Sequence, residues 1–170
     1  SEEKARAFSK KPAWILGLGA ASASVNLAGR DHFTGLKAAK QAADQAYQMA
    51  GVTPADIDVA EVHDCFTIAE MMAYENLGFA EPGQGPELIR NKETYKEGRI
   101  PVNVDGGLLS KGHPIGATGV RQVIELYWHL IQADQVAQRQ VKGATVGLAQ
   151  NSGGTIRGTD AALSVTILNR

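Results

Sequence analysis

The chain has 170 residues, of which 44% are hydrophobic, so it can bury one sizeable core within the usual range of a single domain. Its 17 basic residues nearly balance its 18 acidic residues, and it lacks the basic stripe typical of a nucleic-acid-binding surface. One cysteine excludes a disulfide framework, and no apolar run approaches the roughly 20 residues of a membrane span. No signal-peptide pattern is found, so we expect a cytoplasmic domain that binds neither nucleic acid nor a membrane.

Strand and helix patterns alternate along the chain, as in an α/β layer. The apolar run 13–18 predicts a buried first strand. Small apolar residues at helical spacing predict a closely packed helix over 36–50, closed by Gly51. The segment 57–62 predicts a short strand, and a helix follows from about Thr67 to Leu77.

The alternation continues in the second half of the chain. Residues 80–100 carry glycines, prolines and charges, and predict a long connection. A third helix is expected to bury one apolar face, formed by Val120, Val123, Ile124, Tyr127 and Ile131. The segments 144–149 and 161–168 predict two strands that pair antiparallel across a glycine-rich turn. We therefore expect one α/β domain over residues 1–170.

Three features resemble ligand sites and are discounted. Gly17-Leu-Gly-Ala-Ala-Ser22 is close to a dinucleotide-binding fingerprint but lacks its third glycine. The pair Ser110-Lys111 stands in the wrong order for a phosphate-binding loop. No two histidines share a helix face at the spacing of metal ligands, so we expect no metal site.

The run from Gly106 to Gly119 places one histidine between glycine-dense turns and the start of an apolar helix. Glycine lets a ligand approach the backbone closely. Pro114 suits the first position of a helix, so His113 is expected just ahead of a helix N-terminus, where exposed N–H groups favour developing negative charge. This arrangement favours His113 as an active-site base; the alternative is a structural histidine in a turn.

A second polar cluster, His63-Asp64-Cys65, follows the short strand and precedes a helix. In open α/β sheets, binding sites are built at the carboxyl ends of strands. A helix N-terminus and a neighbouring imidazolium both favour the thiolate form of a cysteine. Cys65 is therefore a candidate reactive thiol, although a lone cysteine can also be a small buried hydrophobe.

His-Asp-Cys-Phe at 63–66 and Gly-Gly-Leu-Leu-Ser-Lys-Gly-His-Pro-Ile-Gly-Ala-Thr-Gly at 106–119 resemble the C-terminal half of a thiolase. The first motif is similar to that of the subgroup with the sterol-carrier-protein-linked thiolases and the archaeal-type acetyl-CoA acetyltransferases. Residues 1–8 resemble the segment that joins the two thiolase halves, so the resemblance covers essentially the whole chain. It implies a thiolase-fold half: a mixed sheet of about five strands with helices on both faces.

The resemblance also implies roles for individual residues. His113 matches the histidine that activates the nucleophilic cysteine, and Cys65 matches the acid/base for Claisen chemistry in this subgroup. His63 stands where many thiolases have an asparagine that positions a water in an oxyanion hole. Gly153 would supply a backbone N–H to an oxyanion hole, and Asn151 takes the place of a second cysteine found in other thiolases. Coenzyme A and acyl-CoA are implied as substrates, with no permanently bound cofactor.

Thiolases also need a cysteine that carries the acyl group, and the family places it in the N-terminal half. Cys65 is the only thiol here, so the resemblance implies an N-terminal half as partner and an inactive isolated chain. It also implies an uncovered, alanine-rich surface on the helix over 36–50, and hence a homo-oligomer or a bound partner. Two alternatives stay open: a retro-aldolase of the steroid side-chain type, and a non-catalytic acyl-CoA-binding or assembly subunit.

Overall fold

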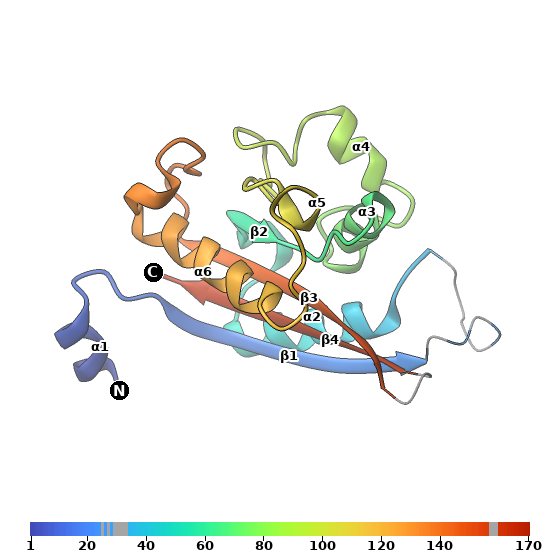
Figure 1. Ribbon diagram of the computed structural model, residues 1–170, viewed down its shortest axis with the longest axis horizontal. Helices are drawn as coiled ribbons and strands as arrows, with labels where there is room; N and C mark the ends of the chain where they lie inside the picture. The colour runs from blue at the N-terminus through green and yellow to red at the C-terminus, as the bar shows by residue number, and fades with distance from the viewer. Residues whose placement is uncertain (25, 27, 29–33, 157–159) are drawn as a thin grey trace.

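The computed structural model describes residues 1–24, 26, 28, 34–156 and 160–170. These residues form a sheet with helices on both of its faces, which confirms the expected α/β class (Figure 1). The helices are α1 (Glu2–Phe8), α2 (Lys37–Ala50), α3 (Thr67–Asn76), α4 (Gly85–Arg90), α5 (Gly107–Lys111) and α6 (Thr118–Ile131), with 3-10 turns η2 (Pro54–Asp56) and η3 (Asp134–Val136). The strands are β1 (Trp14–Ser24), β2 (Val59–Glu61), β3 (Val146–Ile156) and β4 (Asp160–Asn169).

The sheet is mixed, with strand order β1-β4-β3-β2. β4 pairs antiparallel with both β1 and β3, and β3 runs parallel to β2. The predicted antiparallel pairing of the last two strands is confirmed, while residues 157–159 of the turn between them lie outside the described residues. On the free side of β2, Val102 forms a parallel bridge with Ala60. The described residues thus form four strands, one fewer than the expected five or so, and the Val102 segment adds only this bridge. Pro101 beside it has no N–H to extend the pairing.

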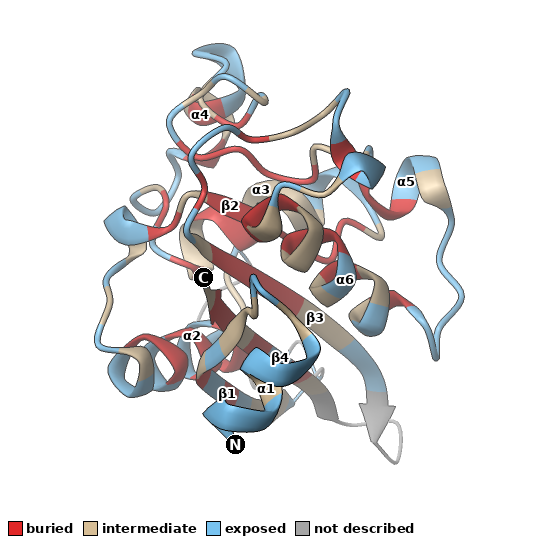
Figure 2. Ribbon diagram, turned by 90° about the vertical axis from the view of Figure 1, so that its left-hand side faces the viewer, coloured by how far each residue is buried: buried red, intermediate tan, exposed pale blue. Residues whose placement is uncertain are grey.

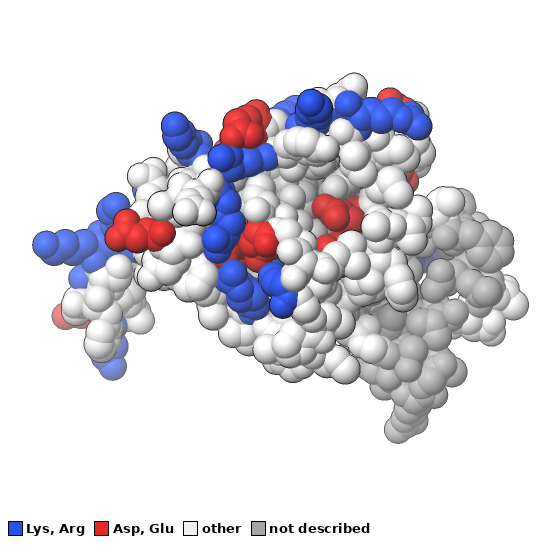
Figure 3. All heavy atoms as spheres, turned by 45° about the horizontal axis from the view of Figure 1, so that its top comes forward, with Lys and Arg blue, Asp and Glu red and all other residues white. Residues whose placement is uncertain are grey.

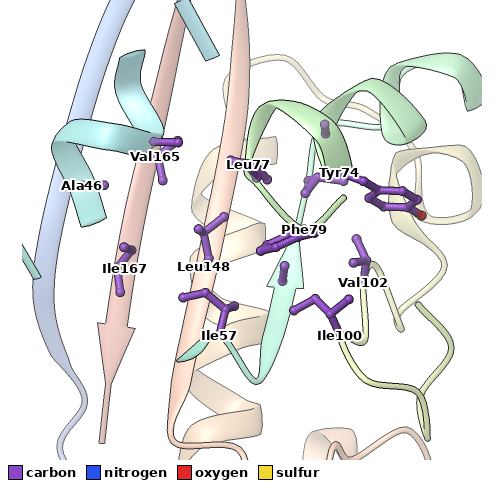
Figure 4. Close-up of a cluster of buried hydrophobic side chains, with 14 of the residues drawn as sticks. Ala46, Ile57, Tyr74, Leu77, Phe79, Ile100, Val102, Leu148, Val165 and Ile167 are labelled. Atoms are coloured by element: carbon purple, nitrogen blue, oxygen red, sulfur yellow. The ribbon is translucent and has the colours of Figure 1, made fainter. Parts of the chain in front are cut away.

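Each central strand sends alternate side chains into two separate cores, as the period of two requires. On β3, Leu148 packs in the core that includes α2 and α3, and Ala149 packs in the core that includes α6. Figure 2 shows buried residues along the strands and on the inner sides of these helices. Figure 4 shows the larger core, whose labelled side chains are Ala46, Ile57, Tyr74, Leu77, Phe79, Ile100, Val102, Leu148, Val165 and Ile167.

The alanine face of α2 is buried inside this chain. Five of the six alanines of α2 are at most 2% exposed: Ala38, Ala39, Ala42, Ala43 and Ala46. Glycines on β1 permit the close approach, because a Cβ on Gly17 would lie 2.2 Å from Ala46 O and one on Gly19 would lie 1.8 Å from Ala42 O. The glycines that resemble a dinucleotide fingerprint therefore serve helix–sheet packing. The prediction of an uncovered alanine-rich surface on this helix is wrong, because the sheet covers that face.

The helix α6 also buries a different face from the predicted one. Its buried residues are Thr118, Gln122, Glu125, Leu126, His129 and Leu130. Val120 and Ile124 of the predicted core face are 62% and 37% exposed, and Ile115 in the preceding turn is 86% exposed. Polar groups can occupy the inner face because other segments supply charged and hydrogen-bonding partners for them. Val120 and Ile124 are thus left on the surface, while Val123 packs against the core.

Smaller differences concern element boundaries. The connection 80–100 contains α4, and the glycine-dense turn after Gly106 contains α5, which are both too short to show a helical period in the sequence. Pro114 does not begin α6, whose first residue is Thr118. Figure 3 shows acidic and basic side chains interspersed over one face of the molecule. Within the parts of the chain that the structure describes, no helix has the length and apolar character needed to cross a membrane.

Candidate active site

The two sequence motifs meet because they follow neighbouring parallel segments of the sheet. Residues 63–65 follow β2, and the Gly106-Gly107 turn follows the bridge formed by Val102. Asp64 joins the two motifs, since its buried Oδ1 accepts a hydrogen bond from Leu108 N at 2.7 Å. Gly107 has a φ of +62°, and a Cβ there would lie 2.0 Å from Asp64 Oδ2. Only glycine fits this position without moving the carboxylate.

His63 and His113 lie against each other at the centre of the site. Their ring centroids are 4.9 Å apart and the ring planes meet at 89°. β3 supports the His63 side, because Gln150 Oε1 accepts from His63 N and Asn151 Oδ1 lies 3.0 Å from His63 Nδ1. Three segments far apart in the sequence therefore converge on one pair of imidazoles.

The surroundings of His63 favour its neutral form. Burial lowers the pKa of His63; the hydrogen bond with Asn151 opposes this effect, and the nearby His113 adds to it. Because the oxygen of Asn151 can only accept, the proton of the neutral ring is carried by Nδ1. The second ring nitrogen, Nε2, is then a hydrogen-bond acceptor.

Thr118 sets the tautomer of His113 in a similar way. Its buried Oγ1 lies 2.6 Å from His113 Nδ1 and donates its single hydrogen to Pro114 O at 3.2 Å. Oγ1 must therefore accept from Nδ1–H, which leaves the lone pair of His113 on Nε2. Since His113 is exposed, this basic nitrogen is accessible to a ligand. His113 thus meets the first residue of α6 through its side chain, although a turn separates the two in the backbone.

Cys65 lies two residues after His63, in the turn that leads into α3. It is a free, half-buried thiol. Among the described residues, His63 contacts His113 and Asn151. Cys65 lies at the same end of the sheet because it follows His63 by two residues. A thiol and two imidazoles at one edge can hold and transfer protons.

Gly153 lies on β3, two residues beyond Asn151, where the pairing with β4 becomes irregular. The register shifts between Ser152 and Thr155, so Gly153 and Gly154 fall in this irregularity, and both are exposed. Such bulges redirect backbone groups and are frequent beside active sites. The backbone N–H of Gly153 thus lies two residues beyond Asn151, which contacts His63, and outside a regular ladder.

Asp64, Thr118 and Asn151 support the site, and sequence reasoning assigned none of them a supporting role. Asp64 and Thr118 both lie inside the two motifs, and this was the one sign in the sequence that could have identified them as supporting residues. Their partners lie across the fold or depend on a particular turn, which no local pattern specifies. Among the residues that the structure describes, no group of three or more His, Cys, Asp or Glu side chains could hold a metal ion.

Comparisons with known proteins agree with this arrangement. Residues 19–169 match the family described as thiolase C-terminal domain-like. The chain is 42% identical over 153 residues to an acetyl-CoA acetyltransferase of Methanothermobacter thermautotrophicus, which covers 90% of this chain and 39% of that protein. It is 45% identical over 119 residues to sterol carrier protein 2 of Homo sapiens, covering 70% of this chain and 21% of that protein.

A solved structure shares the fold. The Ltp2–ChsH2(DUF35) aldolase superposes with a TM-score of 0.77 at 24% identity, covering 94% of this chain and 40% of that one. The chain spans about two fifths of the length of the acetyl-CoA acetyltransferases that it matches. With its family match, its relatives and the meeting of its two motifs, the chain belongs to the thiolase C-terminal domain family.

Proposed function

We propose that this chain is the C-terminal catalytic domain of a thiolase-type acyltransferase, which exchanges acyl groups between coenzyme A and a 3-oxoacyl-CoA. The observation that carries the proposal is the 4.9 Å contact between His63 and His113, with Nδ1 of each ring engaged by a fixed oxygen. Both Nε2 atoms are then left with lone pairs toward any bound molecule. The relatives named acetyl-CoA acetyltransferases support the reaction class.

The acyl-transfer step assigns His113 the role of base. Nε2 removes the proton from a nucleophilic cysteine of an N-terminal half, and the thiolate attacks the thioester carbonyl. A new carbon–sulfur bond forms to the enzyme, the bond to the sulfur of coenzyme A breaks, and the departing sulfur takes the proton from His113. The lone pair fixed on Nε2 by Thr118 suits this role.

Cys65 is assigned the carbon–carbon step. Its thiolate removes a proton from the α-carbon of a second acyl-CoA, and the carbanion attacks the carbonyl of the acyl-enzyme. The bond to the nucleophilic sulfur breaks and its thiolate is regenerated. In the cleavage direction Cys65 returns the proton to the α-carbon.

His63 and Gly153 are assigned to the carbonyl oxygen that becomes negative. The lone pair on His63 Nε2 can accept one hydrogen of a water, whose other hydrogen is donated to that oxygen. The N–H of Gly153 would supply a second donor. Fixed donors aimed at developing charge are the largest single contribution in many acyl-transfer enzymes.

The exposed apolar face of α6 is assigned to the N-terminal half. Val120 and Ile124 stand on this face, Ile115 precedes it, and Leu18 of the neighbouring sheet surface is also exposed. Covering these side chains would bring the nucleophilic cysteine to the end of α6 at which His113 lies. Homo-oligomer formation, a cytoplasmic location and coenzyme A as substrate stay predictions.

The test uses the full-length protein and traps the acyl-enzyme by mass spectrometry. Cys65→Ala should still become acylated by an acyl-CoA while carbon–carbon bond formation falls by about 10²–10⁴. His113→Ala should slow acylation itself. Acylation lost equally in both variants would contradict the division of roles. A wild-type protein that cleaves a steroid side-chain substrate without an acyl-enzyme would favour the retro-aldolase, and one that binds acyl-CoA without turnover would favour a binding subunit.

A further inference from the structure

The backbone around His113 has few supports of its own. Residues 112–117 are all exposed, and α5, which precedes them, has only five residues. A helix of this length is unstable without tertiary contacts, because few backbone hydrogen bonds offset its ordering. On its C-terminal side His113 is held by Thr118, and on its N-terminal side its position depends on what holds the end of α5.

Lys111, the last residue of α5, is held by two buried carboxylates. Its Nζ lies 2.9 Å from Glu61 Oε2 and also contacts Asp105 Oδ2. The side chains of Lys111, Glu61 and Asp105 are 16%, 0% and 2% exposed. Glu61 ends β2 two residues before His63, and Lys111 ends α5 two residues before His113. The contact between Lys111 and Glu61 therefore ties the two histidine-bearing segments together just upstream of both rings.

Asp105 holds the other end of the same short helix. Its Oδ1 accepts a hydrogen bond from Gly107 N at 2.9 Å, while its Oδ2 contacts Lys111. One carboxylate thus fixes both the first and the last residue of α5. Burial, together with Asp105, raises the pKa of Glu61 to about 8, and Lys111 acts against this shift. The ammonium group is therefore what favours an ionised Glu61.

A second group of charged side chains lies on α6 and on the segment after η3. Arg121 is 3.8 Å from Asp105 and bonds Glu125 Oε2 at 2.8 Å. Arg139 bonds both oxygens of the buried Glu125, at 2.5 and 2.9 Å. The hydrogen bonds of Arg139 secure α6 to the segment after η3 and do not involve α5 or Asp105. Arg139 therefore offers a matched control, because it too pairs with a buried carboxylate.

We propose that Lys111 is a positioning residue for acyl transfer: its buried contacts with Glu61 and Asp105 fix the end of α5 and so hold His113 against His63. The rate effect rests on the proposed function, whereas the geometric effect does not. Loss of the ammonium would free the exposed segment 112–117 from its nearest upstream anchor. His113 would then leave the contact with His63, and its Nε2 would no longer face the reacting sulfur.

The experiment compares Lys111→Met with Arg139→Met in the full-length protein. Single-turnover acylation by an acyl-CoA should fall about 10²-fold in Lys111→Met, since a displacement of about 1 Å can cost that much. Arg139→Met should lower thermal stability yet acylate at close to the wild-type rate. Lys111→Arg should recover part of the lost rate, because it restores a cation between the carboxylates.

A second measurement does not depend on turnover. Carbethoxylation of His113 by diethyl pyrocarbonate, located by peptide mass spectrometry, should accelerate several-fold in Lys111→Met and stay unchanged in Arg139→Met. Unchanged acylation and labelling in folded Lys111→Met would overturn the proposal, and so would equal effects of the two variants.

The proposal can still be tested if Lys111→Met does not fold or if the wild-type protein forms no acyl-enzyme. If Lys111→Met does not fold, Glu61→Leu removes the same contact from the other side. It should change rate and labelling in the same directions, and wild-type behaviour of that variant would overturn the proposal. If the wild-type protein forms no acyl-enzyme, the proposed function fails, while the labelling result still decides whether Lys111 positions His113.

Discussion

Replacing Thr118 by valine tests whether one hydroxyl decides which nitrogen of His113 is basic. Valine keeps the shape of threonine and removes Oγ1, which accepts from His113 Nδ1–H at 2.6 Å and donates to Pro114 O at 3.2 Å. Without this acceptor, the proton of the neutral ring is free to move to Nε2. The fraction of His113 with a basic nitrogen in the productive position then falls.

The size of the effect follows from the hydrogen bonds that are lost. A neutral hydrogen bond contributes about 0.5–1.5 kcal/mol net. With about 1.4 kcal/mol per factor of ten, this range corresponds to a fall of roughly 2- to 13-fold in the rate. His113 and Pro114 are exposed, so water can satisfy the groups that valine leaves unpaired. We therefore expect a loss in this range and no larger one.

The assay is single-turnover acylation of the full-length protein, followed across pH. Thr118→Ser is the matched control, because it keeps the hydroxyl and loses only a methyl group; it should acylate faster than Thr118→Val. The same rate in both variants would refute the assignment of the tautomer. A collapse of several orders of magnitude in Thr118→Val would show instead that the hydroxyl acts on the reacting atoms.

Two further predictions concern stability. Gly19→Ala should destabilise the full-length protein by about 1–3 kcal/mol or more, because its Cβ would lie 1.8 Å from Ala42 O. Gly154→Ala, which enters open space, should change stability by less than about 0.5 kcal/mol, and equal denaturation midpoints would contradict the packing argument. Burial alone would raise the pKa of Glu125, but hydrogen bonds from His129 and Arg139 and the charges of Arg139 and Arg121 lower it well below 4.5. The stabilisation from ionised Glu125 is thus present above pH 4.5 and is lost as the pH falls further. The urea midpoints of the wild-type protein and of Glu125→Gln should therefore converge in acid. A difference between the two midpoints that does not change with pH would exclude this linkage.

The sequence predicted those elements whose identity depends on local periodicity. The helix from Thr67 to about Leu77 and the two antiparallel strands near the C-terminus have apolar patterns of sufficient length, and both are confirmed. The short helix α5 could not be predicted in this way, because it is held by side chains from elsewhere, such as Asp64 on Leu108 N. Pro114 was predicted at the first position of the helix, but it begins a turn that precedes Thr118, the first residue of α6.

The candidate site was predictable in its residues and not in its geometry. Gly-His-Pro and His-Asp-Cys identified His113 and His63 as chemical groups, yet their contact depends on a parallel bridge between Ala60 and Val102. Such a bridge joins segments about 40 residues apart and leaves no period in the sequence. Lys111 is the clearest example, since its neighbours in the chain give no sign that its side chain is buried between carboxylates.

The exposure of Val120 and Ile124 on α6, against the prediction, has a physical reason. Hydrophobic periodicity assigns the whole apolar stripe to the core, but the buried face carries Glu125 and His129 beside Leu126 and Leu130. Other segments supply partners for these polar side chains, as when His129 Nδ1 accepts from Val141 N at 3.2 Å. The apolar face with Val120 and Ile124 is left outside, although monomers rarely expose such stripes without a use for them. Leu126 and Leu130 pack in the core on the inner face of α6, so apolar contacts hold the helix and the outer face is free to meet a covering surface. Under the proposed function an N-terminal half supplies this cover, and burial of Val120 and Ile124 completes the site beside His113.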